Sequence, residues 1–498
     1  MFRRLLPLAL LATLPSLAQE PAAPPATVPH VATEPATPAL TLEECVARAL
    51  DKNFNLQLQE FTTQNARDQV VIADAGFDPT LFATAAVAGA ENDNATPSTS
   101  TRQQTASVGV TQRFVTGADA TLRTSLDRTR SSASLTPLFN PVFTNDLSLS
   151  VTQPLLQGFG ITINRASIER ARLGITRAHL DFKAVVLSLI RDVESAYYTL
   201  AFSRERLAVR KFSLEVAQTL LDENKARLKT GVATNLDVLQ AEVGVANARR
   251  DLLLAEQDVR DGEDSLLNLI GRFEFSSRLG AVRLSDAPVP AVSFDASYAL
   301  ALANAPDYAS GKVLAEQLKL DVAVAKNNRL PVLDLGAGVG FNGEGRRTAG
   351  SALNSTTTGQ AYDWQVDLTL SIPWGLRAER ARYRQALTSL DRQQVVVEQL
   401  DQSLLLQVRS AVRAVETNRE TVSVSTLATE LSQKQFETEK ARYEAGLSTY
   451  RFVEDSRQDL DTARVNELLA KVNLRIALAE LARLEGTSLD RYQVKLEE

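Results

Sequence analysis

Side chains suited to catalysis or metal binding are scarce in this chain of 498 residues. It has one cysteine, Cys45, and two histidines, His30 and His179, which lie far apart in the sequence. The sequence offers no serine–histidine–aspartate set, no glycine-rich phosphate loop and no metal-ligand spacing, so we expect no enzyme, no metal centre and no cofactor. Cys45 is expected to be a small buried residue near the start of a helix. The polar residues that remain of interest stand at two turns.

Each turn lies within a stretch that the chain contains twice, at residues 225–271 and 440–486. The two copies align without a gap at a constant offset of 215 residues, which indicates an internal duplication. Each copy reads as a long helix, a short Gly-x-x-Thr turn and a returning helix. Glycine is expected at such a reversal because it tolerates positive φ. The pairs at the turns are Gly231 with Gly446 and Thr234 with Thr449.

Both turns must be positioned by very long helices, which we expect at about 163–270 and about 376–485. Residues 175–230 and 376–445 contain neither glycine nor proline. Their apolar residues recur at alternating spacings of four and three, which is the pattern of a coiled-coil seam. Because helices of this length cannot bury themselves within one compact domain, they are expected to lie along other helices.

The hydrophobic period changes to two at about 81–153 and again at about 332–373. These segments are apolar on one face and polar or charged on the other, which is typical of a transmembrane barrel. Trp364 and Trp374 stand at the two ends of the last strand, where interfacial aromatic residues are expected. A soluble sandwich with one wet face is the alternative interpretation.

The N-terminus predicts export. Arg3 and Arg4 precede an apolar run that is too short to span a membrane, and small residues precede Gln19, as in a signal peptide. No cysteine follows this cleavage site, so no lipid anchor is expected. In chain order, the predicted organisation is a signal peptide at 1–18, a disordered Pro/Ala-rich leader at 19–40, a first structural repeat at 41–271, a connector at 272–293, a second repeat at 294–486 and a tail at 487–498.

This duplicated pattern resembles the TolC family of outer-membrane efflux channels. The resemblance covers essentially the whole mature chain. The features that carry it are Thr41-Leu42-Glu43-Glu44, Gln153-Pro154-Leu155 and the two turns Gly231–Asp237 and Gly446–Asp455. It implies a mixed α and transmembrane β fold, in which a coiled-coil helical tube in the periplasm joins the strands of a β-barrel shared by a homotrimer.

The resemblance also implies location and partners. The barrel would sit among the lipids of the outer membrane of a Gram-negative-type bacterium, and the turns would form a periplasmic tip. This tip would dock on a periplasmic adaptor protein attached to an inner-membrane pump. A nucleic-acid partner is not expected, since the net charge of -6 is spread over the whole length.

The number of strands departs from the family pattern of four in each protomer. The region before Gln153 alone predicts four, at about 81–90, 104–115, 119–129 and 145–153. With two more in the second repeat, a trimer would have eighteen strands and not twelve. The alternative is that 104–129 forms a hairpin outside the barrel.

The family also implies gate residues at the turns. Its aspartate and tyrosine, which tie the closed tip together, match Asp237 and Tyr443, but the arginine that completes the tie is Ser448 here. Two acidic positions of the second turn correspond to Phe452 and Asp455, with Glu454 beside the latter. We hypothesise a ring of negative charge from Asp455 with Glu454. The alternative is that these are solvated surface residues.

The predicted function is an outer-membrane exit duct of a tripartite efflux or type I secretion system, which conducts its substrates passively. A periplasmic coiled-coil structural protein without a pore is the alternative. It would leave the amphipathic strands unexplained. The sequence does not specify the exported substrate.

Overall fold

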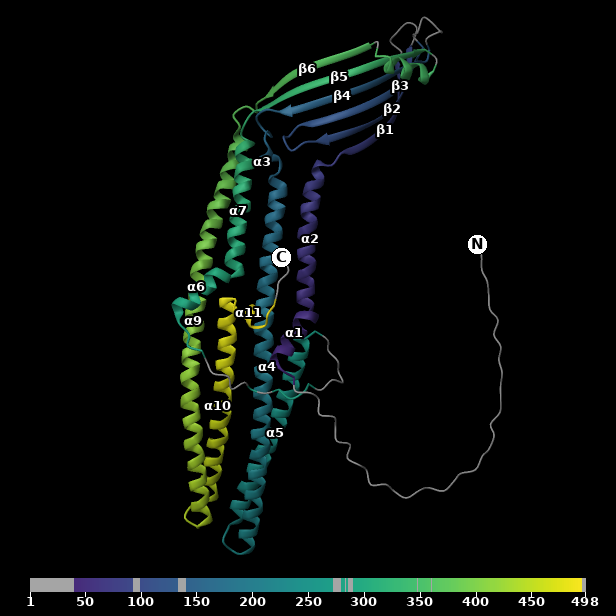
Figure 1. Cartoon of the computed structure of the whole chain (residues 1–498). Coiled ribbons are helices and arrows are strands. Elements are labelled where there is room, and N and C mark those ends of the chain that lie inside the picture. Colours follow the sequence, from purple (N-terminus) through teal and green to yellow (C-terminus); the bar gives the residue numbers. More distant parts are fainter. Residues whose placement is uncertain are drawn as a thin grey trace, which may run out of the picture.

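The computed structural model describes residues 40–92, 99–132, 140–271, 279–282, 284, 290–346, 348–359 and 361–494. The molecule is elongated, with a β-sheet at one end and two long helical hairpins that reach the other end (Figure 1). The predicted signal peptide at 1–18, residues 19–39 of the predicted leader and part of the connector lie outside the described residues.

The first helical segment is divided at Asn53 into α1 (Leu42–Lys52) and α2 (Phe54–Asp74), followed by the short η1 (Ala75–Phe77). Asn53 ends one helix and caps the next, because its side-chain oxygen accepts a hydrogen bond from the Asn55 amide at 2.9 Å. Its side-chain nitrogen donates to the carbonyl of Leu269 at 3.0 Å, which fixes the break against the end of α5 (Asn235–Leu269).

Six antiparallel strands form one sheet in chain order, β1 to β6. Each register is continuous from end to end. The hairpin of β2 and β3 lies inside the sheet, paired with both neighbours, so the alternative that placed it outside is wrong. The strands are β1 (Thr80–Asn92), β2 (Thr99–Arg113), β3 (Asp119–Ser131), β4 (Val142–Pro154), β5 (Val332–Arg346) and β6 (Ala361–Ser371).

The two faces of this sheet differ in polarity along paired rows. One row that crosses five strands consists of Val110, Leu122, Leu149, Val339 and Trp364. The adjacent row, whose side chains point to the opposite face, consists of Thr111, Thr121, Ser150, Gly338 and Gln365. The apolar side chains of β6 are largely exposed in the single protomer. One face of the sheet is therefore apolar, and it is uncovered except at the distal end of β4 and β5, where residues 349–357 pack on it.

A short helix, α8 (Ala349–Thr357), stands between β5 and β6. It packs on the distal end of β5, where a Cβ at Gly343 or Gly345 would collide with α8. Thr356 fixes the contact by accepting a hydrogen bond from Asn145 of β4 at 2.9 Å. Gly343 and Gly345 thus allow the close approach of α8 to the sheet.

The hairpins consist of α4 (Ala166–Lys229) with α5 (Asn235–Leu269) and of α9 (Arg377–Glu444) with α10 (Tyr450–Glu485). Shorter helices are α3 (Ile161–Asn164) and α7 (Pro306–Asn327), which lie next to the sheet, and α6 (Phe294–Asn304), which packs on α9 and α10 about midway along the molecule (Figure 1). Among the described helices, none has the length and apolarity needed to cross a membrane.

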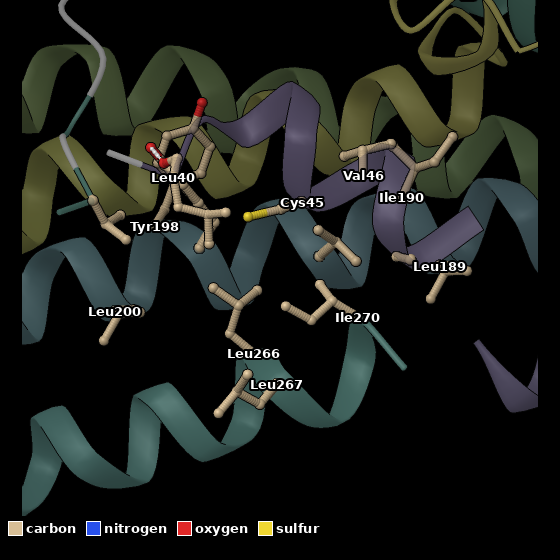
Figure 2. Close-up of a cluster of buried hydrophobic side chains, with 14 of the residues drawn as sticks. Leu40, Cys45, Val46, Leu189, Ile190, Tyr198, Leu200, Leu266, Leu267 and Ile270 are labelled. Carbon is tan, nitrogen blue, oxygen red and sulfur yellow. Dashed lines mark hydrogen bonds between the residues drawn. The ribbon is translucent and has the colours of Figure 1, made fainter. Parts of the chain in front are cut away.

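The largest buried cluster among the described residues joins α1, α4 and α5 about midway along the molecule (Figure 1), and Figure 2 shows its side chains. Cys45 lies within it, fully buried, as predicted. Burial raises the pKa of its thiol to about 12, so it is an inert core residue.

The C-terminal segment returns to α4 through α11 (Ser488–Arg491). Tyr492 donates a hydrogen bond to Glu194, a carboxylate with only 2% of its surface exposed, and Arg491 lies 3.5 Å from the same oxygen. Residues 488–494 of the predicted tail are thus docked on the first repeat.

Candidate functional site at the two helical turns

The two turns have the same backbone geometry. Gly231 and Gly446 both have positive φ, at 79° and 76°. In each turn the amide after the glycine reaches back to an arginine carbonyl, from Val232 to Arg227 at 2.9 Å and from Leu447 to Arg442 at 2.8 Å. This 6→1 hydrogen bond satisfies the end of a long helix, as in a Schellman motif. Because a Cβ on either glycine would meet no atom within 4 Å, the requirement for glycine is one of conformation alone.

The threonines that follow differ in their partners. Thr234 caps α5, and its hydroxyl oxygen accepts from the Asp237 amide at 3.2 Å. In return, the Asp237 carboxylate accepts from the Thr234 amide at 2.8 Å, which completes a capping box. Thr449 precedes α10 in an extended conformation without a side-chain hydrogen bond. The aspartate predicted as a gate tie is therefore engaged within its own turn, and Tyr443 has other partners.

Tyr443 of α9 inserts against the last turns of α4. Its hydroxyl donates to Asn224 Oδ1 at 2.6 Å, and the guanidinium of Arg227 lies 4.3 Å from the centre of its ring. Arg227 also donates to the Tyr443 carbonyl at 3.2 Å. Burial raises the pKa of this phenol, and Asp237 raises it further against the opposing effect of Arg227. The hydroxyl therefore remains a donor at neutral pH.

An apolar cluster surrounds this contact and joins the two hairpins near the turns. Its buried members come from α4, α5, α9 and α10, and they are Leu220, Leu221, Ala241, Tyr443, Tyr450 and Val453. Tyr443 and Tyr450 meet edge to face with ring centres 6.5 Å apart. The hairpins of one protomer are thus packed together close to their tips.

A buried ionic network extends this junction toward the sheet. Arg457 of α10 is only 5% exposed and donates to Glu454 at 2.7 and 2.9 Å and to Asp461 at 2.7 Å. Ser213 of α4 bonds to both Arg457 and Asp461, the latter at 2.6 Å. The network therefore crosses from one hairpin to the other. Its charges are costly to bury and remain stable only while they are paired.

Two predicted residues point away from this junction. Phe452 is exposed, and the side chain of Asp455 is 59% exposed, with its carboxylate 3.8 Å from Arg451. Glu454, in contrast, accepts three hydrogen bonds from Arg457 and Gln458. Within the part of the chain that the structure describes, no group of three or more potential ligands could hold a metal ion.

Residues 119–272 and 297–487 match the model of a protein family described as outer membrane efflux protein. The chain belongs to this family. The resemblance to the TolC family is thereby confirmed, and this efflux-family protein is an outer-membrane protein whose helices extend into the periplasm.

Curated relatives and solved structures agree with this assignment. The efflux-family protein is 28% identical over 176 residues to the pyoverdine export outer membrane protein OpmQ of Pseudomonas putida, which covers 35% of this chain and 37% of that relative. It is 26% identical over 330 residues to OpmQ of Pseudomonas aeruginosa, 63% of each chain. The chain thus spans less than two thirds of both relatives. The crystal structure of VceC from Vibrio cholerae shares the fold, with a TM-score of 0.66 over 89% of this chain and 96% of that chain at 16% identity.

The predicted site residues of this efflux-family protein fall into separate places. Asp237 lies in a capping box, Tyr443 lies in the junction between hairpins, and Glu454 is buried against Arg457. Phe452 and Asp455 remain exposed. A ring that includes Glu454 is therefore not supported by its placement, because a buried and paired carboxylate cannot line an opening.

Sequence reasoning missed Asn224, Arg227, Ser213 and Arg457. One signal was available for the last of these. Glu454, Arg457 and Asp461 recur at helical spacings of three and four, which places an arginine between two carboxylates on one face of α10. Nothing in the sequence indicated that this face is buried.

Proposed function

We propose that this protein is a passive exit duct of the outer membrane, working as a homotrimer in a tripartite efflux or type I secretion system. Substrates would enter at the two helical turns of each protomer and leave through a barrel formed by its strands. The observation that carries the proposal is the sheet itself. Its apolar face is uncovered apart from the distal part under α8, and β1 and β6 leave open edges that lipid cannot satisfy.

Closure of the sheet into a barrel by symmetric copies would pair the open edges of β1 and β6 and turn the apolar face toward lipid. Three copies of a six-stranded sheet make a barrel of eighteen strands, in which β6 of one copy meets β1 of the next. Exposed apolar seams on the helices support association as well. On α5 the seam consists of Leu236, Leu239, Val243 and Leu253, and on α9 it consists of Val424, Leu427 and Leu431. Contiguous apolar surfaces of this kind indicate protein–protein contacts.

A periplasmic adaptor protein and an inner-membrane pump are the proposed partners. The turns expose Val232 and Leu447, at 74% and 72% of their surface, at the far end from the sheet (Figure 1). Such side chains suit a docking surface for an adaptor. Because two relatives are named for pyoverdine export, pyoverdine is the first cargo that we propose to test.

Current through planar bilayers tests the proposal. We expect discrete single-channel steps after insertion of the purified trimer, and we expect the protein in the outer-membrane fraction of cells. The competing function, a periplasmic coiled-coil protein without a pore, predicts no current and recovery in the soluble periplasmic fraction. That result would exclude a duct. We propose no enzymatic activity.

A further inference from the structure

Three arginines lie on the apolar face of the sheet, at the end farthest from the long helical hairpins, and on strands β2 and β3 beside the two strands that α8 covers. Their face follows from the continuous pairing of β2 with β3, since paired residues point to the same side. Toward the distal end, the side chains of this face on β2 are Val110, Val108, Ala106, Gln104 and Arg102. On β3 they are Leu122, Thr124, Leu126, Arg128 and Arg130. Apolar residues thus give way to cationic ones on both strands.

Arg102 and Arg130 are direct partners in the ladder, so two like charges face each other across neighbouring strands. Such a pair is destabilising unless an anion neutralises it. Both residues are exposed. Neither guanidinium group forms an ion pair or hydrogen bond with another residue that the structure describes. Arg128, one step closer to the apolar band, is oriented by a 2.7 Å hydrogen bond to Gln104.

The neighbouring strand leaves space beside this pair. Gly89 of β1 completes the row next to Arg102 and has no side chain to occupy it. A hollow of about 660 Å³ opens here, lined by Gly89, Arg102, Arg130 and the start of the following loop. Glu91 also lines it but forms no ion pair with either arginine among the described residues. The hollow therefore offers two unneutralised guanidinium groups.

We propose that Arg102, Arg128 and Arg130 bind a phosphate monoester of a lipid headgroup in the leaflet that surrounds the distal end of the sheet. The inference rests on the proposed function, which places the sheet in a membrane. Guanidinium groups bind phosphate through paired, charge-assisted hydrogen bonds, and basic clusters at the membrane surface recognise anionic headgroups. Arg128 lies two residues beyond Leu126, the last apolar side chain of its strand, which would place the arginine beside the headgroups if the apolar band faces lipid. The phosphorylated lipid A part of lipopolysaccharide has the required chemistry.

Native mass spectrometry of the purified full-length trimer tests the site. Lipid A with two phosphates, dephosphorylated lipid A and inorganic phosphate serve as probes. We expect the native protein to retain phosphorylated lipid A, and Arg102→Gln/Arg128→Gln/Arg130→Gln to weaken its binding at least about tenfold. Arg123→Gln, on the same strand but on the polar face, is the matched control and should bind as the native protein does.

The alternatives give different results. Equal binding of dephosphorylated lipid A, undiminished binding by the triple variant, or displacement of the lipid by equimolar inorganic phosphate would each overturn the proposal. Arg102→Gln alone, at an exposed position, provides a second measurement if the triple variant does not fold, and it should also weaken binding. Absence of channel current in the native protein would instead overturn the proposed function, so the two failures are distinguishable.

Discussion

Tyr443 and Asn224 join the two helical hairpins of one protomer by a 2.6 Å hydrogen bond. The tyrosine comes from α9 and the asparagine from α4, and both side chains are buried. Asn224 is itself held by a bond from its side-chain nitrogen to the Leu220 carbonyl at 2.8 Å. This pair therefore joins the hairpins near the turns, where the family resemblance implies a tie between Tyr443 and Asp237.

Tyr443→Phe should loosen this junction. The substitution leaves the buried Asn224 oxygen without its donor, at a cost of about 1–3 kcal/mol. We expect a lower apparent Tm and a higher single-channel conductance, because the turns can then separate more easily. Tyr362→Phe, at an exposed position on β6, is the control. Identical conductance in native and Tyr443→Phe channels would show that the bond does not restrict the opening.

Arg457→Met should be among the most destabilising single changes in the hairpins. It leaves Glu454 and Asp461 buried without their cation, which costs about 3–5 kcal/mol. Chemical unfolding followed by circular dichroism measures the loss. Adding Glu454→Gln and Asp461→Asn should recover part of it, because neutral amides need no counter-charge. Arg451→Met, whose pair with Asp455 is exposed, should change little.

Gly231→Ala and Gly446→Ala should each lower stability by about 1–2 kcal/mol, since an L side chain is strained at positive φ. The space around both glycines is open, so strain is the sole expected cost. Asparagine should be tolerated better than alanine at both positions. Gly76→Ala is matched in having open space but lacks positive φ, and an equal loss there would refute the conformational explanation.

Asp455→Asn should reduce cation preference in the reconstituted channel. Three copies of this exposed carboxylate would form the negative ring of the mouth. We expect the cation-to-anion permeability ratio to fall by about half or more. Asp459→Asn, exposed one turn farther along α10, and Glu454→Gln, which is buried, should leave the ratio unchanged. An unaltered ratio for Asp455→Asn would eliminate the ring.

Stability should depend on pH through Glu194. Burial raises its pKa above the ordinary value of 4.5, against the opposing effects of Tyr492 and Arg491. The folded state then holds the Glu194 proton more tightly than the unfolded chain does. The stability that this proton contributes is therefore fully present below pH 4.5 and is lost as the pH rises through the raised pKa of the folded state. Glu194→Gln, which cannot ionise, should show a smaller fall in apparent Tm over that range. Glu169→Gln, exposed on the same helix, should behave as the native protein does.

The sequence was most informative where one local rule governs a long segment. The absence of glycine and proline predicted α9 to within a residue and most of α4, which begins nine residues before the run and contains Gly174, and alternation predicted all six strands. It was least informative where distant segments meet. Arg457 contacts Ser213, which is 244 residues away, and no periodicity reveals such a partner. From the sequence, the Asp237 carboxylate could equally have bonded to another helix or to its own turn. In the structure it forms the local capping box with Thr234.

The unequal repeats have a consequence for transport. Each repeat supplies one helical hairpin, but the first supplies four strands and the second only two. In the proposed trimer the barrel is thereby widened while the number of helices at the mouth stays the same. The barrel and the mouth at the turns then act as two electrical resistances in series. The narrower of them, the mouth, dominates the total resistance of the duct. Because the β2–β3 hairpin widens the barrel, the turns limit the flow, and the outer part of the duct is a wide vestibule.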